Sequence, residues 1–213
     1  MIVRPRPGAL QLFFILRGSI LPQIAAKILF ISLLACIVVA LYENELLNSL
    51  KGLSAPPFSL LGVALSVFLG FRNSTCYDRW WEARKQWGEL IIQTRNLARE
   101  CQALLPGAPN AALRERLLKR SIAFAHALAA QLRDQDVQAA VQGRIGADEV
   151  AALQGRRNVP DALLHWEHQD LADCMHDGRL SDVLYQRLAR HLDALGAAQA
   201  CCERIKSTPT PVA

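Results

Sequence analysis

The sequence predicts an all-α membrane protein with long helices, two membrane spans and a cytoplasmic helical bundle. Hydrophobic residues make up 52% of the 213 residues, more than soluble domains usually contain. Two long apolar segments, residues 20–42 and about 56–76, supply the candidate spans of a membrane region over residues 20–76. No segment alternates between apolar and polar residues as a half-buried strand does. We therefore expect helices throughout the chain.

The N-terminal residues 1–19 place Arg4, Arg6 and Arg17 around a short apolar patch. This patch is too interrupted for the apolar core of a signal peptide. We interpret the segment as interfacial, with its arginines facing lipid headgroups and its apolar side chains entering the membrane boundary. A strap packed on the body of the protein is an equal alternative.

The first predicted span, residues 20–42, is long enough to cross a bilayer, and Lys27 near its start can reach the headgroups. A loop with glycine and two prolines follows it. Basic residues precede this span and follow the second one, so the positive-inside rule places both ends of the chain in the cytoplasm.

The second span belongs to the stretch from Pro56 to Gly88, around which the rest of the chain is organised. Here a short apolar run passes without a helix breaker into a polar helix rich in arginine and tryptophan. At 3.6 residues per turn, one face of this helix is bulky and apolar. That face carries Leu60, Val63, Val67 and Phe71.

The neighbouring face of the same helix carries small residues at every fourth position, Gly62, Ser66 and Gly70. Small residues at this spacing let helices pack closely in lipid. Together the two faces suggest an oligomeric pore with an apolar constriction. Ordinary core packing is the alternative, because the clean apolar run covers only about 21 Å of a hydrocarbon layer about 30 Å thick. A central, shielded position in an assembly is compatible with that short length.

Residues 77–206 are expected to form a cytoplasmic helical domain. The helix of the second span continues toward Leu105, where a cluster of two prolines and a glycine stops it. A second long helix covers about residues 110–134. A weakly periodic stretch, residues 141–160, follows it.

Two further helices complete this domain. The first contains PDALLHWEHQDLADCMHDG, and Asp177 and Gly178 are expected to end it. Ser181 can cap the second, which runs to about Lys206. Residues 207–213, with two prolines, cannot extend it.

The string GFRNSTCYDRWWEARKQWGELI resembles the signature of the bestrophins, in particular their bacterial branch, and weaker similarity runs from Met1 to about Pro211. This resemblance implies a homopentameric channel in the cell inner membrane, in contact with lipid and passing small inorganic ions. The second membrane helix of such a channel lines the pore, and three apolar residues spaced four apart form its neck. Aligned on the RWW triplet at Arg79, the neck positions are Val63, Val67 and Phe71.

Two polar residues below Phe71, Ser74 and Asp78, continue the same face and are expected to line the pore. Five ionised copies of Asp78 would form a ring that attracts cations, whereas pairing with Arg79 or Arg84 of a neighbour would neutralise it. On this ground we lean toward cation passage, although the family is known mainly for chloride passage. The bacterial branch also includes cation-selective members.

The resemblance also implies a second constriction at the cytoplasmic exit, which we place on Leu180. The alternative is that Leu180 only packs against the start of the helix that Ser181 caps.

Charged and aromatic residues from Arg79 to Trp87 mix cations with indoles, which suits a membrane interface and packing between subunits better than nucleic-acid stacking. The net charge of +5 is spread among carboxylates and forms no basic block, so a nucleic-acid partner is not expected. The six cysteines show no C-x-x-C pair, and we expect reduced thiols.

Motifs for catalysis are absent: no G-x-S-x-G, phosphate loop or dinucleotide fingerprint occurs, so neither an enzyme nor a cofactor is expected. The densest set of candidate ligands, between His165 and Asp177, contains only a loose H-x-x-H. We interpret it as the polar face of a cytoplasmic helix rather than a metal site.

The chain departs from the bestrophin pattern at its end. The family has four membrane helices, and the last two normally follow a segment like ERIKSTPTP, whereas this sequence stops at Ala213. Residues 207–213 are therefore interpreted as a truncated linker toward a third span. The rival hypothesis to a channel is a nonconducting, membrane-anchored helical protein.

Overall fold

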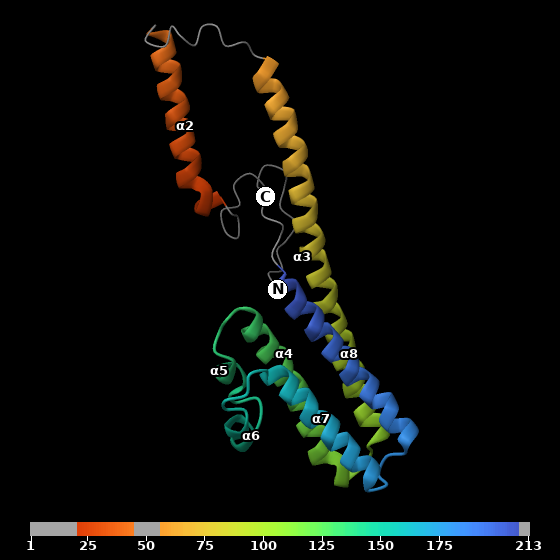
Figure 1. The fold of residues 1–213 in the computed structure, drawn as a ribbon. Helices are drawn as coiled ribbons and strands as arrows, with labels where there is room; N and C mark the ends of the chain where they lie inside the picture. Colours follow the sequence, from red (N-terminus) through yellow and green to blue (C-terminus); the bar gives the residue numbers. More distant parts are fainter. Residues whose placement is uncertain (1–20, 45–55, 209–213) are drawn as a thin grey trace, which may run out of the picture. The chain divides into compact units, whose positions relative to one another are not determined.

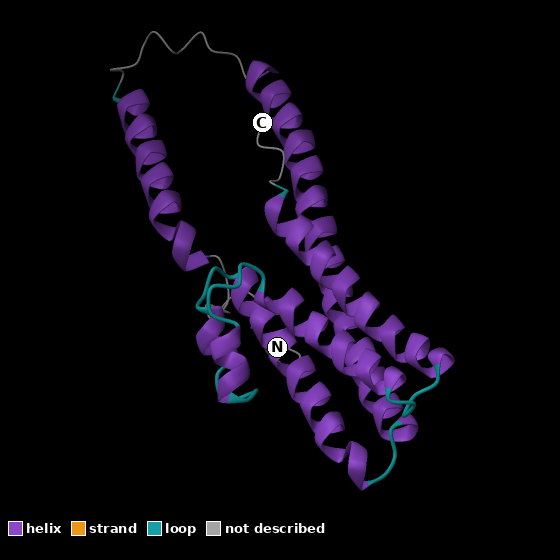
Figure 2. Ribbon diagram, turned by 60° about the horizontal axis from the view of Figure 1, so that its bottom comes forward, coloured by secondary structure: helices purple, strands orange, loops and turns teal. Residues whose placement is uncertain are grey.

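The computed structural model describes residues 21–44 and 56–208, and these residues contain helices and no strand (Figures 1 and 2). The predicted all-α fold is confirmed. The interfacial segment 1–19, most of the loop between the predicted spans and residues 209–213 lie outside the described residues. The helices are α2 (Leu21–Glu43), α3 (Pro56–Leu104), the 3₁₀ turn η2 (Ala108–Asn110), α4 (Ala111–Leu132), α5 (Val137–Val141), α6 (Ala147–Ala152), α7 (Val159–His176) and α8 (Asp182–Ser207).

Helix α2 corresponds to the first predicted span. It is 23 residues long, and its apolar side chains from Ile28 onward are largely exposed. Among the described residues, α2 and α3 are the two helices long and apolar enough to cross a membrane, by length and composition. Neither has its apolar window buried inside the chain, as the core helix of a soluble protein would.

Helix α3 is continuous over 49 residues, as the absence of breakers predicts. Pro56 and Pro57 occupy its first turn, where a missing amide hydrogen costs least. Buried side chains first occur at Leu90 and continue at Leu97 and Cys101. Its N-terminal part is therefore apolar and uncovered within the chain, while its C-terminal part packs in a core. The helix ends just before Pro106 and Gly107, and Gly107 has a φ of 84° that favours glycine.

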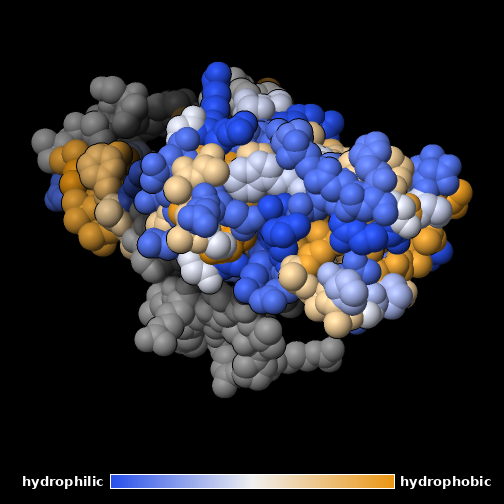
Figure 3. Space-filling model, turned by 90° about the horizontal axis from the view of Figure 1, so that it is seen from below, coloured by the Kyte–Doolittle hydropathy of each residue, from blue (hydrophilic) through white to orange (hydrophobic). Residues whose placement is uncertain are grey.

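The helical body consists of the C-terminal part of α3 with α4, α7 and α8. Helix α7 packs against both α4 and α8, and α5 packs on α4. Figures 1 and 2 show α8 running beside α3. The core contains the fully buried side chains of Leu97, Phe124, Leu163 and Leu192. The face of the molecule in Figure 3 is mostly hydrophilic, and its apolar side chains gather in separate patches.

The turn between α7 and α8 follows the predicted stop and cap signals. The amide of Gly178, which has a φ of 70°, donates to the carbonyl of Met175, and the amide of Arg179 donates to the carbonyl of Cys174. The Ser181 hydroxyl then accepts a hydrogen bond from the Leu184 amide at 3.4 Å and caps α8.

Two short helices, α5 and α6, were not predicted. They have five and six residues, too few for a hydrophobic period to show. A capping residue was the available signal for α5, because the Asp136 carboxylate accepts hydrogen bonds from the amides of Gln138 and Ala139.

Candidate pore helix and its anchor in the helical body

The three predicted neck residues lie at every fourth position of α3. Val63, Val67 and Phe71 are 62%, 54% and 72% exposed within the chain. Side chains of this size are normally covered by protein or lipid. This apolar face is therefore not covered by its own chain, and it can contact lipid, contact another chain or line a pore.

The small residues of the neighbouring face also have open surroundings. A Cβ atom added at Gly62 or Gly70 would meet no atom within 4 Å. Ser66 is exposed as well. Contacts within the chain therefore do not require small side chains at these positions.

The two predicted polar lining residues, Ser74 and Asp78, are exposed on α3. Among the described residues, the Asp78 carboxylate makes no ion pair, and the neighbouring Arg79 is bound elsewhere. Asp78 is thus available to face solvent or a passing ion.

Arg79 joins α3 to the C-terminal end of α8. Its Nη2 donates to the carbonyl oxygen of Ile205 at 2.6 Å, and its Nη1 donates to the carbonyl oxygen of Thr208. The last carbonyl groups of a helix have no partner within it and carry partial negative charge. The guanidinium group satisfies two carbonyls at this end of α8 and complements their charge.

A salt bridge between Glu82 of α3 and Arg204 of α8 supports the same junction. We had expected the charges from Arg79 to Trp87 to act between subunits. Arg79 and Glu82 instead connect two helices of one chain. Trp87 packs partly buried against the core, while Trp80 and Trp81 stay about half exposed.

A second polar junction between α3 and α8 lies further toward the C-terminal end of α3. The Arg187 guanidinium donates to Glu100 at 2.9 Å, and His191 lies between Gln93 and Glu100, with its Nδ1 2.6 Å from Gln93 Oε1. The hydrogen bond from Arg187 is the main reason that the pKa of Glu100 is below its usual range. The junction at Arg79 and Glu82 and the junction at Glu100 hold the C-terminal half of α3 against α8.

Leu180, the predicted cytoplasmic constriction, is only 3% exposed and belongs to the hydrophobic core. Tyr185, four residues after the Ser181 cap, packs against the same core, as in a hydrophobic staple. Val183, on the first turn of α8, is 68% exposed. Within a single chain, Val183 therefore exposes more apolar surface than Leu180 does.

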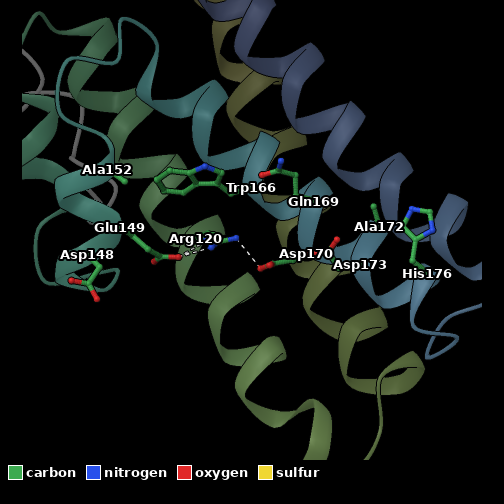
Figure 4. A pocket seen from close by; sticks show the side chains of 10 residues that line it. All are labelled: Arg120, Asp148, Glu149, Ala152, Trp166, Gln169, Asp170, Ala172, Asp173 and His176. Carbon is green, nitrogen blue, oxygen red and sulfur yellow. Dashed lines mark hydrogen bonds and ion pairs between the residues drawn. The ribbon is translucent and has the colours of Figure 1, made fainter.

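A partly buried charged network that the sequence did not predict joins α4, α6 and α7 (Figure 4). The Arg120 side chain bonds to Glu149 at 2.5 Å and to Asp170 at 2.8 Å, and its guanidinium carbon lies 5.4 Å from the Trp166 ring centroid. Arg116 forms a bidentate pair with Asp170. Arg120, Glu149, Trp166 and Asp170 border a cavity of about 520 Å³. The sequence did contain one indication of this network, because Arg120 falls among the apolar residues that α4 buries.

The candidate ligands between His165 and Asp177 do not converge. Glu167 is buried, His168 lies 3.6 Å from Asp193, and Asp170 binds arginines. Over residues 21–44 and 56–208, no group of three histidine, cysteine or acidic side chains has the arrangement of a metal site.

Two exposed apolar helices, one of them continuing as a polar helix into a packed body, are the arrangement expected of a membrane protein. The chain belongs to the bestrophin family. The family model described as bacterial/fungal bestrophin protein matches residues 1–213. This membership confirms the resemblance and makes the chain a bestrophin-like ion channel rather than an enzyme.

Two similar proteins align with this chain over its whole length. The voltage-dependent anion channel-forming protein of Mesorhizobium japonicum is 39% identical over 213 residues, which are 100% of this chain and 67% of that protein. The protein of the same description from Escherichia coli K12 is 36% identical, with 69% of its length covered. A crystal structure of a bacterial bestrophin homolog from Klebsiella pneumoniae has a TM-score of 0.81 and 31% identity. That match covers 89% of this chain and 69% of the solved one.

Proposed function

We propose that five copies of the chain surround a pore lined by α3, with Val63, Val67 and Phe71 as its neck. The observation that carries this proposal is the uncovered apolar face of α3, which continues without a break into a helix anchored in the body. A helix that stood alone in lipid would not need the small stripe beside that face. A homo-oligomer also fits the family.

In this proposal the neck controls ion passage by dewetting. Rings of valine and phenylalanine side chains offer no hydrogen bonds to water, so a narrow ring of them resists hydrated ions. Ser74 and Asp78 then meet the ion on the cytoplasmic side of the neck. The inner membrane, with the N-terminus and the helical body in the cytoplasm, is the location that the distribution of basic residues favours.

The sign of the ion has two candidate answers. The relatives are described as anion channel-forming, which favours anions such as chloride. Asp78 favours cations, because it is exposed without an ion pair among the described residues while Arg79 binds carbonyl groups of α8. A ring of carboxylates attracts cations and repels chloride.

Reversal potentials under a KCl gradient distinguish these answers. Wild-type protein in planar bilayers is compared with Asp78→Asn, and with Glu115→Gln as an exposed acidic control on α4, away from the proposed pore. A potential near that of potassium, shifted toward that of chloride by Asp78→Asn alone, supports the cation answer. A wild-type potential near the chloride value overturns it and leaves anion passage.

The rival, a nonconducting anchored protein, is tested by chemical crosslinking in mild detergent. A ladder of products that ends at the pentamer supports the pore. A strict monomer contradicts it.

A further inference from the structure

A buried carboxyl group between α4 and α7 takes no part in the pore described above. The Glu167 side chain on α7 is fully buried. Its Oε1 accepts a hydrogen bond from the Ser121 hydroxyl of α4 at 2.9 Å. Its Oε2 is buried as well and has no hydrogen-bond partner. One neutral hydroxyl is much less than an ionised carboxylate needs in an apolar core.

Arg120 favours the ionised form of this carboxyl group, but its effect on the pKa is smaller than that of burial. Arg120, next to Ser121 on α4, directs its guanidinium group to Glu149 and Asp170. The remaining acidic neighbours are Asp170 on α7 itself and the Cys101 thiol on α3. Asp170 repels a second negative charge and so also raises the pKa of Glu167.

Solvent approaches the same place from the other side of Ser121. A cavity of about 300 Å³ lies between α3 and α4, and Ser121 is among its lining residues. Thr94, Arg95 and His126 supply other polar groups of its wall. Burial, with a further contribution from Arg144, lowers the pKa of His126, so this histidine is mainly neutral at neutral pH. Ser121 therefore both bonds to the carboxyl group and borders this cavity, whose wall also contains apolar side chains.

We propose that Glu167 is a proton-binding site, which holds a carboxylic acid in the packed body and weakens the contact of α4 with α7 when it releases the proton toward Ser121. Binding forms the O–H bond of the acid from a carboxylate and a proton of solvent, and release reverses it. The unpartnered Oε2 then carries no net charge in the protonated state, which removes the main cost of its burial.

The proton site makes stability depend on pH. Burial raises the pKa of Glu167 to about 8, from 4.5 for a free side chain. Because the folded chain keeps a proton that the unfolded chain loses, the contribution of Glu167 to stability is greatest below pH 4.5. It falls as pH rises to about 8 and changes no further above. Within this window the folding equilibrium constant falls by up to about tenfold per pH unit.

The test compares thermal unfolding of the full chain in detergent with that of Glu167→Gln, from about pH 5 to about pH 9. Glutamine keeps the size and one acceptor but cannot ionise. We expect the midpoint of the variant, relative to wild type, to rise steadily up to about pH 8 and then to level off. Glu115→Gln, at an exposed position of α4, should leave the curve parallel to wild type. A constant difference between Glu167→Gln and wild type overturns the proposal.

An infrared titration of the wild type keeps the proposal testable if Glu167→Gln does not fold. A protonated carboxyl band should be present at neutral pH and disappear at alkaline pH. Ser121→Ala should shift its frequency, because the hydroxyl group bonds to this carboxyl. Absence of the band at neutral pH contradicts proton binding. Neither measurement depends on ion flux, so both are independent of the proposed pore.

Discussion

Arg79 of α3 and Ile205 of α8 are joined across 126 positions of sequence by a hydrogen bond of 2.6 Å from a guanidinium nitrogen to a main-chain carbonyl oxygen. Together with the bond to Thr208, it closes the end of α8 on the helix that we propose to line the pore.

Removal of this link should loosen the end of α8. Arg79→Ala leaves two carbonyl groups without their charged donor and should cost about 1–3 kcal/mol of stability. Arg79→Lys keeps the charge but lacks the planar fork that reaches two carbonyls, so it should recover only part of the loss. Hydrogen exchange at residues 200–208 measures the effect. Unchanged protection in Arg79→Ala would contradict a role for this bond.

Replacement of the three neck residues, Val63, Val67 and Phe71, by alanine should widen the constriction. We expect faster ion flux and weaker discrimination among ions in liposomes, because a wider apolar ring dewets less readily. Leu65→Ala is the matched control, since Leu65 lies on another face of α3 and is similarly exposed. Equal flux through the triple variant and wild type would remove these residues from the neck.

The small stripe predicts an effect on assembly. Gly70→Leu adds bulk where the single chain has space, so the fold of one chain should tolerate it. Close packing between helices should not, and the oligomer should dissociate on size-exclusion chromatography. Ala35→Leu adds nearly as much bulk to exposed α2 as a control. Survival of the oligomer with Gly70→Leu would show that this face contacts lipid or a void.

The buried network around Arg120 should be essential to the body. Arg120→Met removes the cation and leaves Glu149 and part of Asp170 unpaired, and breaking such a pair costs about 3–5 kcal/mol. Lys119→Met breaks the exposed pair with Glu115 and should cost about 1 kcal/mol or less. Denaturant unfolding of both variants measures the contrast. Equal losses would show that burial adds nothing at Arg120.

Much of the architecture could be predicted from local patterns. The course of α3 followed from an unbroken helical period that ends at Pro106, and the turn into α8 followed from Gly178 and Ser181. These signals depend on residues close together in the chain. The apolar face of Val63, Val67 and Phe71 could also be predicted from local spacing, because these residues belong to one helix.

Contacts between distant residues could not be predicted. Arg120, Glu149 and Asp170 come from three helices, and their charges resemble those of any solvated surface until the helices pack. Glu167 likewise seemed part of a polar helix face, yet α4 covers it. Leu180 lies inside the core, which fits the alternative that it packs against the start of the helix capped by Ser181.

The length of α3 has a mechanical consequence. At about 1.5 Å per residue, its 49 residues extend over roughly 74 Å, and no proline interrupts it after Pro57. Such a rod bends only gently, so a tilt imposed where Arg79 meets the end of α8 displaces Phe71, two turns away, in the same rigid movement. The helix can thereby act as a lever, so that in the proposed pore a force applied to the helical body would move Phe71 without a hinge between them.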